Sequence, residues 1–335
     1  MKRLILLVSC ILLTFGTSAQ VKFVDAKELT LVNKLCPTEK LYDRVDTDKY
    51  DFNEAEATRL RFTGGLALAF ETNSTTIDIK TQYSDYRSTN NSTLIATAGY
   101  DLYIMDAGEW KYAYSGVAAK NYVLHLIKDM DTTCKQCLLY LPTYSRVDSI
   151  WIGVDEKASI KAMANPFRHR IMIIGSSYTH GTGVSRSGMA YPLQLERATG
   201  LQFVALGVSG QSKMQPAFAQ LVCDNQCDAL VMDAFSNPDA ATIRARVIPF
   251  IAKIREVHPK LPIIFLRSIY REGRNFNRDI DDFEAAKDSA AVEMMSLAMK
   301  QFDDVYFLDV TSQTGTDHIT SVDGVHPDDL GYWRW

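Results

Sequence analysis

Two residues of this sequence, a serine and a distant histidine, have neighbours that suit them for catalysis. Ser177 follows the apolar run Ile171–Ile174, and His326 lies three residues after Asp323, near the end of the chain. A serine hydroxyl is a weak nucleophile until a base takes its proton and a third group orients that base. Ser177, His326 and Asp323 supply these three groups, so the pattern predicts acyl transfer by a nucleophilic serine.

Two loops between Ser177 and His326 could hold the negative charge that this reaction develops. Gly210 follows the apolar run Phe203–Leu206, and Asn237 follows the run Ala229–Met232. The backbone N–H groups of Ser177 and Gly210, with the side-chain amide of Asn237, could converge on the oxyanion formed when an ester carbonyl is attacked. Each loop is a weak signal alone, and their order after successive strands strengthens it.

These residues need elements that bring several loops to one edge of a sheet. From residue 171 onward the chain alternates apolar strands with amphipathic helices, which indicates a parallel sheet covered on both faces. Such a sheet places its site at the carboxyl ends of the strands. The predicted strands are Ile171–Ile174, Phe203–Leu206, Ala229–Met232, Ile263–Leu266 and Val305–Leu308, and the predicted helices are Met189–Thr199, Met214–Val222, Ala241–Val257 and Asp282–Gln301.

The first half of the chain has a different pattern. Short alternating runs such as Thr76–Lys80 and Tyr122–Leu126, separated by turn clusters such as Asn90–Ser92, predict an antiparallel β-sandwich. The charged segment Asp155–Arg168 is the predicted linker. We therefore expect a β-sandwich domain over residues 20–160, then a doubly wound three-layer α/β/α domain over residues 161–335.

Residues 1–19 have the pattern of a secretory signal peptide. Lys2 and Arg3 precede an apolar stretch, and the small residues Thr17–Ala19 follow it. The sequence therefore predicts an exported protein, periplasmic or extracellular, with no membrane insertion after cleavage. The formal net charge is −4, and basic and acidic residues are interspersed along the chain. This pattern does not predict a surface that binds nucleic acid.

The cysteines allow three interpretations. In an oxidising compartment the close pairs Cys134/Cys137 and Cys223/Cys227 predict two local disulfides, which would leave Cys36 unpaired. A four-cysteine zinc site is an alternative, although the two pairs fall in different predicted domains. A redox role for Cys134 and Cys137 is weak because no thioredoxin-like strand and helix surround them.

The four blocks of the second half resemble the SGNH or GDSL-type esterases and acylhydrolases. The matching residues are Ser177 in 175–179, Gly210 in 209–211, Asn237 in 236–238 and His326 in 323–327. The resemblance implies a flavodoxin-like fold, with Ser177 as nucleophile and oxyanion donor, Gly210 and Asn237 as further donors, His326 as base and Asp323 as its orienting group. It implies no metal or organic cofactor.

The resemblance extends to the first half and has two departures. Gly99-Tyr100-Asp101-Leu102-Tyr103 is similar to the Gly-x-Asp-Leu-Tyr signature of the β domain that precedes one bacterial subgroup of these esterases, and we expect it to be a structural strand and turn. Ser176 replaces the aspartate that is common before the nucleophile, and the block at Asn237 lacks an aspartate directly after the asparagine.

Competing interpretations exist for several of these residues. Ser177 could be only a helix N-cap, and Gly210 only part of a tight turn. His180 and His318 are rivals of His326 for the role of base, though neither has a carboxylate placed as Asp323 is.

The predicted function is removal of acetyl or other small acyl groups, from a small-molecule ester or a glycan. The alternatives are a lipid acylhydrolase, a thioesterase, or a catalytically inactive carbohydrate-binding protein. Arg271 and Arg274, after the fourth predicted strand, could meet an acidic substrate, although a solvated loop is the simpler interpretation.

Overall fold

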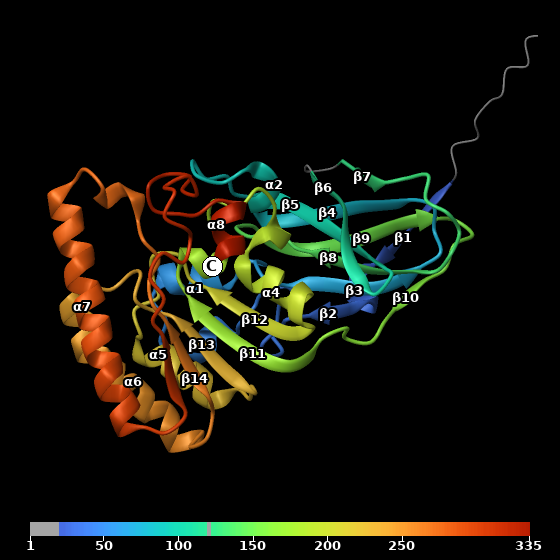
Figure 1. The fold of residues 1–335 in the computed structure, drawn as a ribbon. Coiled ribbons are helices and arrows are strands. Elements are labelled where there is room, and N and C mark those ends of the chain that lie inside the picture. The colour runs from blue at the N-terminus through green and yellow to red at the C-terminus, as the bar shows by residue number, and fades with distance from the viewer. Residues whose placement is uncertain (1–19, 119–121) are drawn as a thin grey trace, which may run out of the picture.

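The structure is a computed structural model that describes residues 20–118 and 122–335. The predicted signal peptide, residues 1–19, lies outside the described residues. An antiparallel β-sandwich and a parallel α/β domain lie side by side, and the end of the chain returns to the junction between them (Figure 1). None of the described helices is long and apolar enough to cross a membrane.

Two antiparallel sheets form the first half, as predicted. Their facing side chains, including Phe70, Leu102 and Ile150, make one buried apolar core. The first sheet has the order β1 (Val21–Asp25), β9 (Arg146–Asp155), β4 (Ile77–Asp85) and β7 (Leu124–Ile127). The second has the order β10 (Ile160–Ala162), β3 (Ala67–Thr72), β8 (Lys135–Tyr140), β5 (Gly99–Asp106) and β6 (Glu109–Val117), with β2 (Thr30–Val32) also paired to β3.

Short helices interrupt the sandwich at the end that faces the second half. Helix α1 (Glu54–Leu60) begins at Asn53, whose side chain accepts from the Glu56 N–H while the Glu56 carboxylate accepts from the Asn53 N–H. Helix α2 is Leu94–Ala98, and the first half also has the 3₁₀ turns η1 (Ala26–Glu28) and η2 (Thr47–Lys49). Residues of α1 and of the loop before α2 contact the second domain, as in the hydrogen bonds from Gln215 to Glu56 and from Thr93 to the Ser185 carbonyl.

The predicted linker contains a strand. Ile160–Ala162 forms β10 and pairs with β3 in the antiparallel sheet, so the predicted boundary between residues 160 and 161 falls within this strand. Ile160 also packs against the sandwich core. The charged residues of this segment favoured a linker over a strand. An edge strand can carry such residues, because it buries only part of its surface.

The second half is a parallel sheet with the strand order β12-β11-β13-β14-β15. All five predicted strands are present, and none of their ends differs by more than three residues from the predicted one. The strand order is that of a flavodoxin-like doubly wound domain. The strands are β11 (Arg168–Gly175), β12 (Leu201–Gly207), β13 (Ala229–Asp233), β14 (Ile263–Leu266) and β15 (Val305–Leu308).

Apolar residues on both faces of this sheet explain why helices cover both sides. Met172 and Ile174 point into a core with helices α5 and α6, whereas Ile173 between them joins the opposite core beside α4 and α8. The helices are α3 (Ser177–His180), α4 (Tyr191–Thr199), α5 (Pro216–Asp224), α6 (Ala240–Val257), α7 (Arg278–Gln301) and α8 (Asp329–Arg334), with 3₁₀ turns η3 (Ser187–Met189) and η4 (Glu272–Arg274).

The Gly-x-Asp-Leu-Tyr segment joins the two domains. It forms most of β5, and its Asp101 accepts a hydrogen bond from the Gly188 N–H at 2.8 Å. Arg186 lies 3.3 Å from the same carboxylate and donates to the Tyr103 hydroxyl at 3.1 Å. Arg197 of α4 lies over the Tyr103 ring at 4.1 Å. The motif is therefore a strand, as expected, and its polar side chains hold the second domain.

Arg44 makes a second connection between the domains. Its fully buried guanidinium donates to the carbonyls of Ala205 (3.0 Å) and Gly207 (2.9 Å) at the carboxyl end of β12, and to the Arg59 carbonyl. Burial lowers the pKa of Arg44 to about 9. A charge held only by backbone carbonyls fixes the position of α1 against the end of the parallel sheet.

The predicted disulfides are wrong, because all five cysteines of the described residues are free thiols. Cys137 is buried in β8, whereas Cys134 is exposed in the turn before this strand. Cys223 lies in the last turn of α5, and Cys227 lies beyond that helix against the core. Close spacing in sequence does not bring these side chains together, since each pair straddles the end of an element. No group of three or more metal-binding side chains occurs among the described residues, so the zinc alternative finds no support there either.

Candidate active site

Ser177 lies on the sharp turn that follows β11. It is the first residue of the short helix α3, whose N-cap is Ser176. The Ser176 hydroxyl accepts from the Tyr178 N–H at 3.1 Å, and Gly181 ends the helix in the left-handed conformation. The alternative that Ser177 serves as the cap is therefore wrong, because Ser176 has that role. Ser177 is left with its side chain available, although only 7% of the residue is exposed.

The structure brings Ser177, His326 and Asp323 together in one chain of contacts. Nε2 of His326 lies 2.9 Å from Oγ of Ser177, and Nδ1 of His326 lies 2.8 Å from Oδ2 of Asp323. The carboxylate also accepts from the backbone N–H of His326 at 2.8 Å. With the proton on Nδ1, the ring donates to Asp323 and leaves Nε2 free to accept the serine proton.

Asn91 from the β-sandwich domain completes the surroundings of Asp323. Its side-chain amide donates to Oδ2 of Asp323 at 2.9 Å and lies 3.4 Å from Nδ1 of His326. Burial acts to raise the pKa of Asp323, but the His326 N–H, the Asn91 amide and the His326 ring outweigh it and lower that pKa to about 2. The carboxylate is therefore ionised across the whole neutral range.

A buried carboxylate below the turn holds two loops in place. Oδ2 of Asp233, at the end of β13, accepts from the N–H (2.9 Å) and hydroxyl (2.7 Å) of Ser176 and from the Thr179 hydroxyl (3.0 Å). Its Oδ1 accepts from the Ser236 hydroxyl at 2.9 Å. Burial raises the pKa of Asp233. Ser176, where the family commonly has aspartate, thus donates to a carboxylate that the neighbouring strand supplies.

Gly210 and Asn237 lie on neighbouring loops at the same edge of the sheet. Gly210 has φ +74° in a turn closed by the bond from the Gln211 N–H to the Val208 carbonyl, a conformation that favours glycine. Oδ1 of Asn237 accepts from the Ser212 N–H at 3.3 Å, which ties this loop to the one that carries Gly210. The Asn237 amide nitrogen is then the end of the side chain left to donate.

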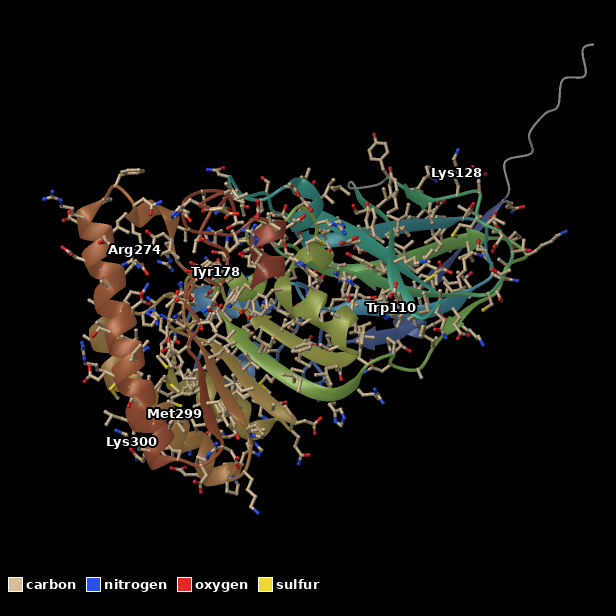
Figure 2. All side chains as sticks on the ribbon, in the orientation of Figure 1. Trp110, Lys128, Tyr178, Arg274, Met299 and Lys300 are labelled. Carbon is tan, nitrogen blue, oxygen red and sulfur yellow. The ribbon has the colours of Figure 1, made fainter. Side chains whose placement is uncertain are left out.

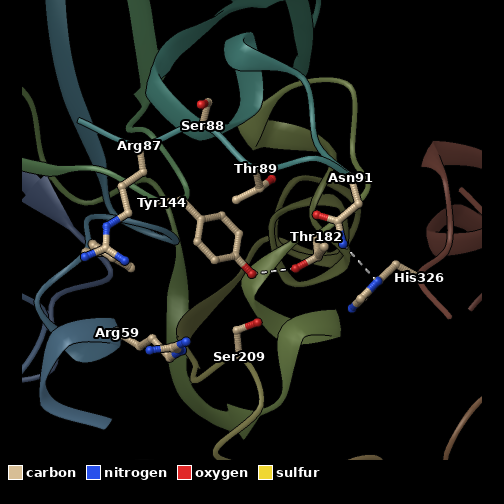
Figure 3. A pocket seen from close by; sticks show the side chains of 10 residues that line it. Arg59, Arg87, Ser88, Thr89, Asn91, Tyr144, Thr182, Ser209 and His326 are labelled. Carbon is tan, nitrogen blue, oxygen red and sulfur yellow. Dashed lines mark hydrogen bonds between the residues drawn. The ribbon is translucent and has the colours of Figure 1, made fainter. Parts of the chain in front are cut away.

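A cavity of about 250 Å³ opens beside His326, and both domains line it (Figure 3). The second domain contributes Thr182, Ser209 and His326, the last two from loops that carry candidate site residues. The β-sandwich domain contributes the larger share of the wall. These residues are Arg59, Phe62, Arg87, Ser88, Thr89, Asn91 and Tyr144.

Neither rival histidine is placed to act on Ser177. His180 is fully buried, its Nε2 bonds the Thr143 carbonyl at 2.8 Å, and its ring stacks on Tyr144 with centroids 4.1 Å apart. Burial, aided by Arg44, holds the pKa of His180 well below its ordinary value. His318 is exposed and pairs with Glu272 at 2.8 Å.

Arg271 and Arg274 do not face the cavity. Arg271 donates to the Tyr178 hydroxyl (2.8 Å), to Glu284 (2.8 Å) and to the Ser236 carbonyl, so it braces the loop before Asn237. Arg274 pairs with Asp281 of α7. The expectation of a solvated loop is therefore wrong for Arg271, and neither residue is placed to meet a substrate. Figure 2 shows Tyr178 where the domains meet and Arg274 near one end of α7.

The short helix α8 packs behind the histidine. Tyr332 is buried and donates to the Thr182 carbonyl at 2.7 Å. Trp335 lies edge-on to Tyr178, with ring centroids 5.8 Å apart, and Tyr178 lies in turn edge-on to His326 at 5.7 Å. The end of the chain thus supports the ring that would act as base.

Family models match both halves of the chain. The model of the GDSL-like lipase/acylhydrolase family matches residues 168–335, and that of the N-terminus of SGNH-hydrolase-type esterases, named GxDLY, matches residues 21–160. A GDSL-like lipase candidate from Bacteroides ovatus is 36% identical, with 94% of each chain covered and a TM-score of 0.91. The chain belongs to the GDSL-like lipase/acylhydrolase family. It is a carboxylic ester hydrolase by that membership, as the sequence predicted.

More distant solved structures share the fold of this GDSL-like acylhydrolase. A salicylyl-acyltransferase from a tetracycline biosynthetic pathway is 18% identical, with a TM-score of 0.71. A family two carbohydrate esterase from Cellvibrio japonicus is 12% identical, with a TM-score of 0.62. Both matches cover 94% of each chain, so the fold of these proteins includes both domains. No curated protein matches the chain significantly.

Sequence reasoning missed the residues that other elements bring to the acylhydrolase site. Asn91 lies 232 positions from Asp323, and the turn cluster 90–92 carried no sign of this contact. In the sequence, Arg59 and Arg87 cannot be distinguished from the other charged residues of the β domain. Asp233 had a detectable signal, because it is a charged residue at the end of an otherwise apolar strand.

Proposed function

We propose that this protein is an exported serine esterase that removes acetyl or other small acyl groups from glycans. The observation that carries the proposal is the contact chain from Ser177 Oγ through the His326 ring to the Asp323 carboxylate, with spacings of 2.9 and 2.8 Å. These three groups in this order are what a serine nucleophile needs for acyl transfer.

The reaction begins when Ser177 attacks the ester carbonyl carbon. His326 Nε2 takes the hydroxyl proton as the new C–O bond forms, and the Asp323 carboxylate stabilises the imidazolium. The oxyanion is held by the N–H groups of Ser177 and Gly210 and by the Asn237 amide. The imidazolium then protonates the leaving alcohol as its bond to the carbonyl carbon breaks.

Water completes the cycle on the acyl-enzyme. His326, neutral again, takes a proton from water as the oxygen attacks the acyl carbon, and returns that proton to Ser177 as the carboxylic acid leaves. Asn91 donates to the same Asp323 oxygen that His326 contacts, so the orienting carboxylate has a second donor that holds its position through both halves of the cycle. No cofactor is needed for any step.

The shape of the site favours a small acyl group. The cavity beside His326 measures about 250 Å³, and arginine, serine, threonine, asparagine and tyrosine side chains line most of it. A long lipid chain would need a larger apolar surface. Glycan esters are supported by the shared fold of carbohydrate esterases, including that from Cellvibrio japonicus.

The proposal is tested by hydrolysis of 4-nitrophenyl acetate and 4-nitrophenyl palmitate. We expect faster release from the acetate and loss of at least about 10³-fold in kcat for Ser177→Ala. The control is Ser84→Ala, at an exposed position of β4. Equal rates for wild type and Ser177→Ala would remove the serine assignment, and a preference for palmitate would favour a lipid acylhydrolase. Binding of acetylated glycans without turnover would favour the inactive carbohydrate-binding alternative.

Export is a separate part of the proposal. The pattern of residues 1–19 supports it, since a basic start, an apolar stretch and small residues precede Gln20. Expression of the full chain in a Gram-negative host, followed by fractionation and N-terminal sequencing, should yield a periplasmic or secreted product that begins at Gln20. A cytoplasmic product that keeps Met1 would contradict it.

A further inference from the structure

Two arginines of the β-sandwich domain line the cavity that contains His326. Arg59 comes from the last turn of α1, and Arg87 comes from the loop after β4. Figure 3 shows both side chains on the same side of the cavity, across from His326. None of the residues that line the cavity is acidic. The cavity therefore has two guanidinium groups and no carboxylate among the residues of its wall, although Arg87 pairs with Asp85 behind that wall.

Arg59 is short of partners. One of its terminal nitrogens donates to the Ala55 carbonyl of its own helix at 3.1 Å, and its Nε is buried without any hydrogen-bond partner. Within the described part of the chain, no carboxylate pairs with it. A buried donor without a partner costs about 1–3 kcal/mol, so the fold tolerates a group that it does not itself satisfy.

Arg44 adds to the positive field below Arg59. Its buried guanidinium has only carbonyl partners, among them the carbonyl of Arg59 itself. Burial first, and then the charges of Arg44 and Arg59, lower the pKa of His180. Charges that are buried in protein interact more strongly with a nearby anion than charges in water do.

Arg87 and Thr89 give the cavity its remaining donors. Nε of Arg87 donates to Asp85 at 2.7 Å, and its guanidinium lies 5.0 Å from the Phe62 ring centroid. This arrangement anchors the side chain and leaves terminal N–H groups to face the cavity. The Thr89 hydroxyl is buried without a partner in the same wall. An anion that enters would meet guanidinium and hydroxyl donors together.

We infer that the substrate carries a carboxylate close to the ester that is cleaved, and that Arg59 and Arg87 bind this carboxylate. The inference rests on the proposed esterase function and narrows its substrate class to acidic esters. A carboxylate fits because guanidinium groups bind it through paired N–H donors. It can belong to the alcohol part, as in an acetylated uronic acid, or to the acyl part, as in a succinyl half-ester.

Two matched pairs of substrates distinguish these sources. The first pair is an acetylated methyl glucuronoside and the corresponding acetylated methyl glucoside, assayed by acetate release. The second pair is the 4-nitrophenyl half-ester of succinate and 4-nitrophenyl acetate. For wild type we expect kcat/KM to be at least about tenfold higher for the acidic member of one pair, and this preference to shrink as salt is added.

The variants Arg59→Gln and Arg87→Gln test which side chains bind the substrate carboxylate. We expect each to lower the ratio of acidic to neutral kcat/KM by about tenfold or more. The matched control is Arg61→Gln, two residues along from Arg59, because Arg61 pairs with Asp48 (3.0 Å) and Thr47 (2.8 Å) outside the cavity. The control should keep the wild-type ratio.

The outcomes separate this inference from the proposed function. Hydrolysis of the neutral esters that requires Ser177, together with an acidic-to-neutral ratio that neither arginine variant changes, would overturn the inference and leave the esterase intact. A wild type without preference for either acidic ester would also overturn it. Failure of wild type to hydrolyse any of the four esters would overturn the proposed function itself.

Discussion

The two domains contribute to the site in different ways. The α/β domain supplies Ser177, Asp323 and His326 from loops at one edge of its sheet, within contacts of 2.8 and 2.9 Å. The β-sandwich domain supplies most of the cavity wall, including Arg59 and Arg87. Reactive groups thus come from one domain, and most of the surface that a substrate would touch comes from the other.

Each contribution follows from the structure of its domain. Parallel strands end at one edge, so short loops there bring reactive groups together by topology alone. The β-sandwich has no such edge, and its loops reach the site only because the domains are held against each other. Asp101 and Arg44 make those connections through the Gly188 N–H and the carbonyls of Ala205 and Gly207. An accessory domain fixed in this way is part of the candidate active site.

The largest expected effect concerns the domain that supplies the chemistry. Asp323→Ala removes the group that orients His326, so we expect kcat for 4-nitrophenyl acetate to fall by roughly 10²- to 10⁴-fold with a smaller change in KM. The matched control is Asp317→Ala, beside the rival His318, where an exposed carboxylate pairs with Arg334. More than about a tenth of wild-type kcat in Asp323→Ala would contradict the role assigned to this carboxylate.

The next effect concerns the connection between the domains. Asp101 is fully buried, and Arg186 lies 3.3 Å away without hydrogen-bond alignment. Arg186→Met leaves the carboxylate without its cation, and we expect the free energy of unfolding at pH 8 to fall by about 3 kcal/mol. Urea denaturation measures it. The control is Arg244→Met, whose exposed pair with Glu293 is worth no more than about 1 kcal/mol.

The pH dependence of this loss identifies its cause. Burial raises the pKa of Asp101 from its ordinary 3.8 to about 6, against the opposing effect of Arg186. The contribution of Asp101 to stability is therefore complete below about pH 4 and is lost as the pH rises through about 6. Without Arg186 the carboxyl should stay protonated more readily, so we expect a smaller loss at pH 5 than at pH 8. Equal losses at both pH values would mean that Arg186 acts through packing alone.

The sequence predicted the contribution of the α/β domain well and that of the β domain poorly. Each catalytic candidate stands in a short motif next to an apolar strand, and all five strands were found because parallel strands are buried on both faces. Asn91, Arg59 and Arg87 carry no such local mark, because their roles depend on contacts across the domain boundary. The two disulfides were wrong for a related reason, since spacing along the chain does not show which way a side chain points.

A smaller effect is expected where the two domains touch. Asn91→Ala removes the donor to Asp323, and we expect kcat to fall about tenfold, consistent with one hydrogen bond to a charged group. Asn91→Asp should cost more than Asn91→Ala, because it places a second carboxylate beside the first. The control is Asn90→Ala at the neighbouring exposed position. A merely structural loop residue would affect stability alike in both Asn91 variants and would not rank them by charge.

The smallest expected effect separates a tight turn from an oxyanion donor. Gly210 and Gly200 have nearly the same φ, +74° and +71°, and an added Cβ would meet no atom within 4 Å at either. Gly210→Ala and Gly200→Ala should therefore cost the same strain, about 1 kcal/mol, in urea denaturation. Gly200 ends α4 away from the site, so only Gly210→Ala should also lower kcat, by about threefold to tenfold, as the N–H direction shifts. Equal kcat in the two variants would leave Gly210 as a turn residue and reduce the candidate oxyanion donors to Ser177 and Asn237.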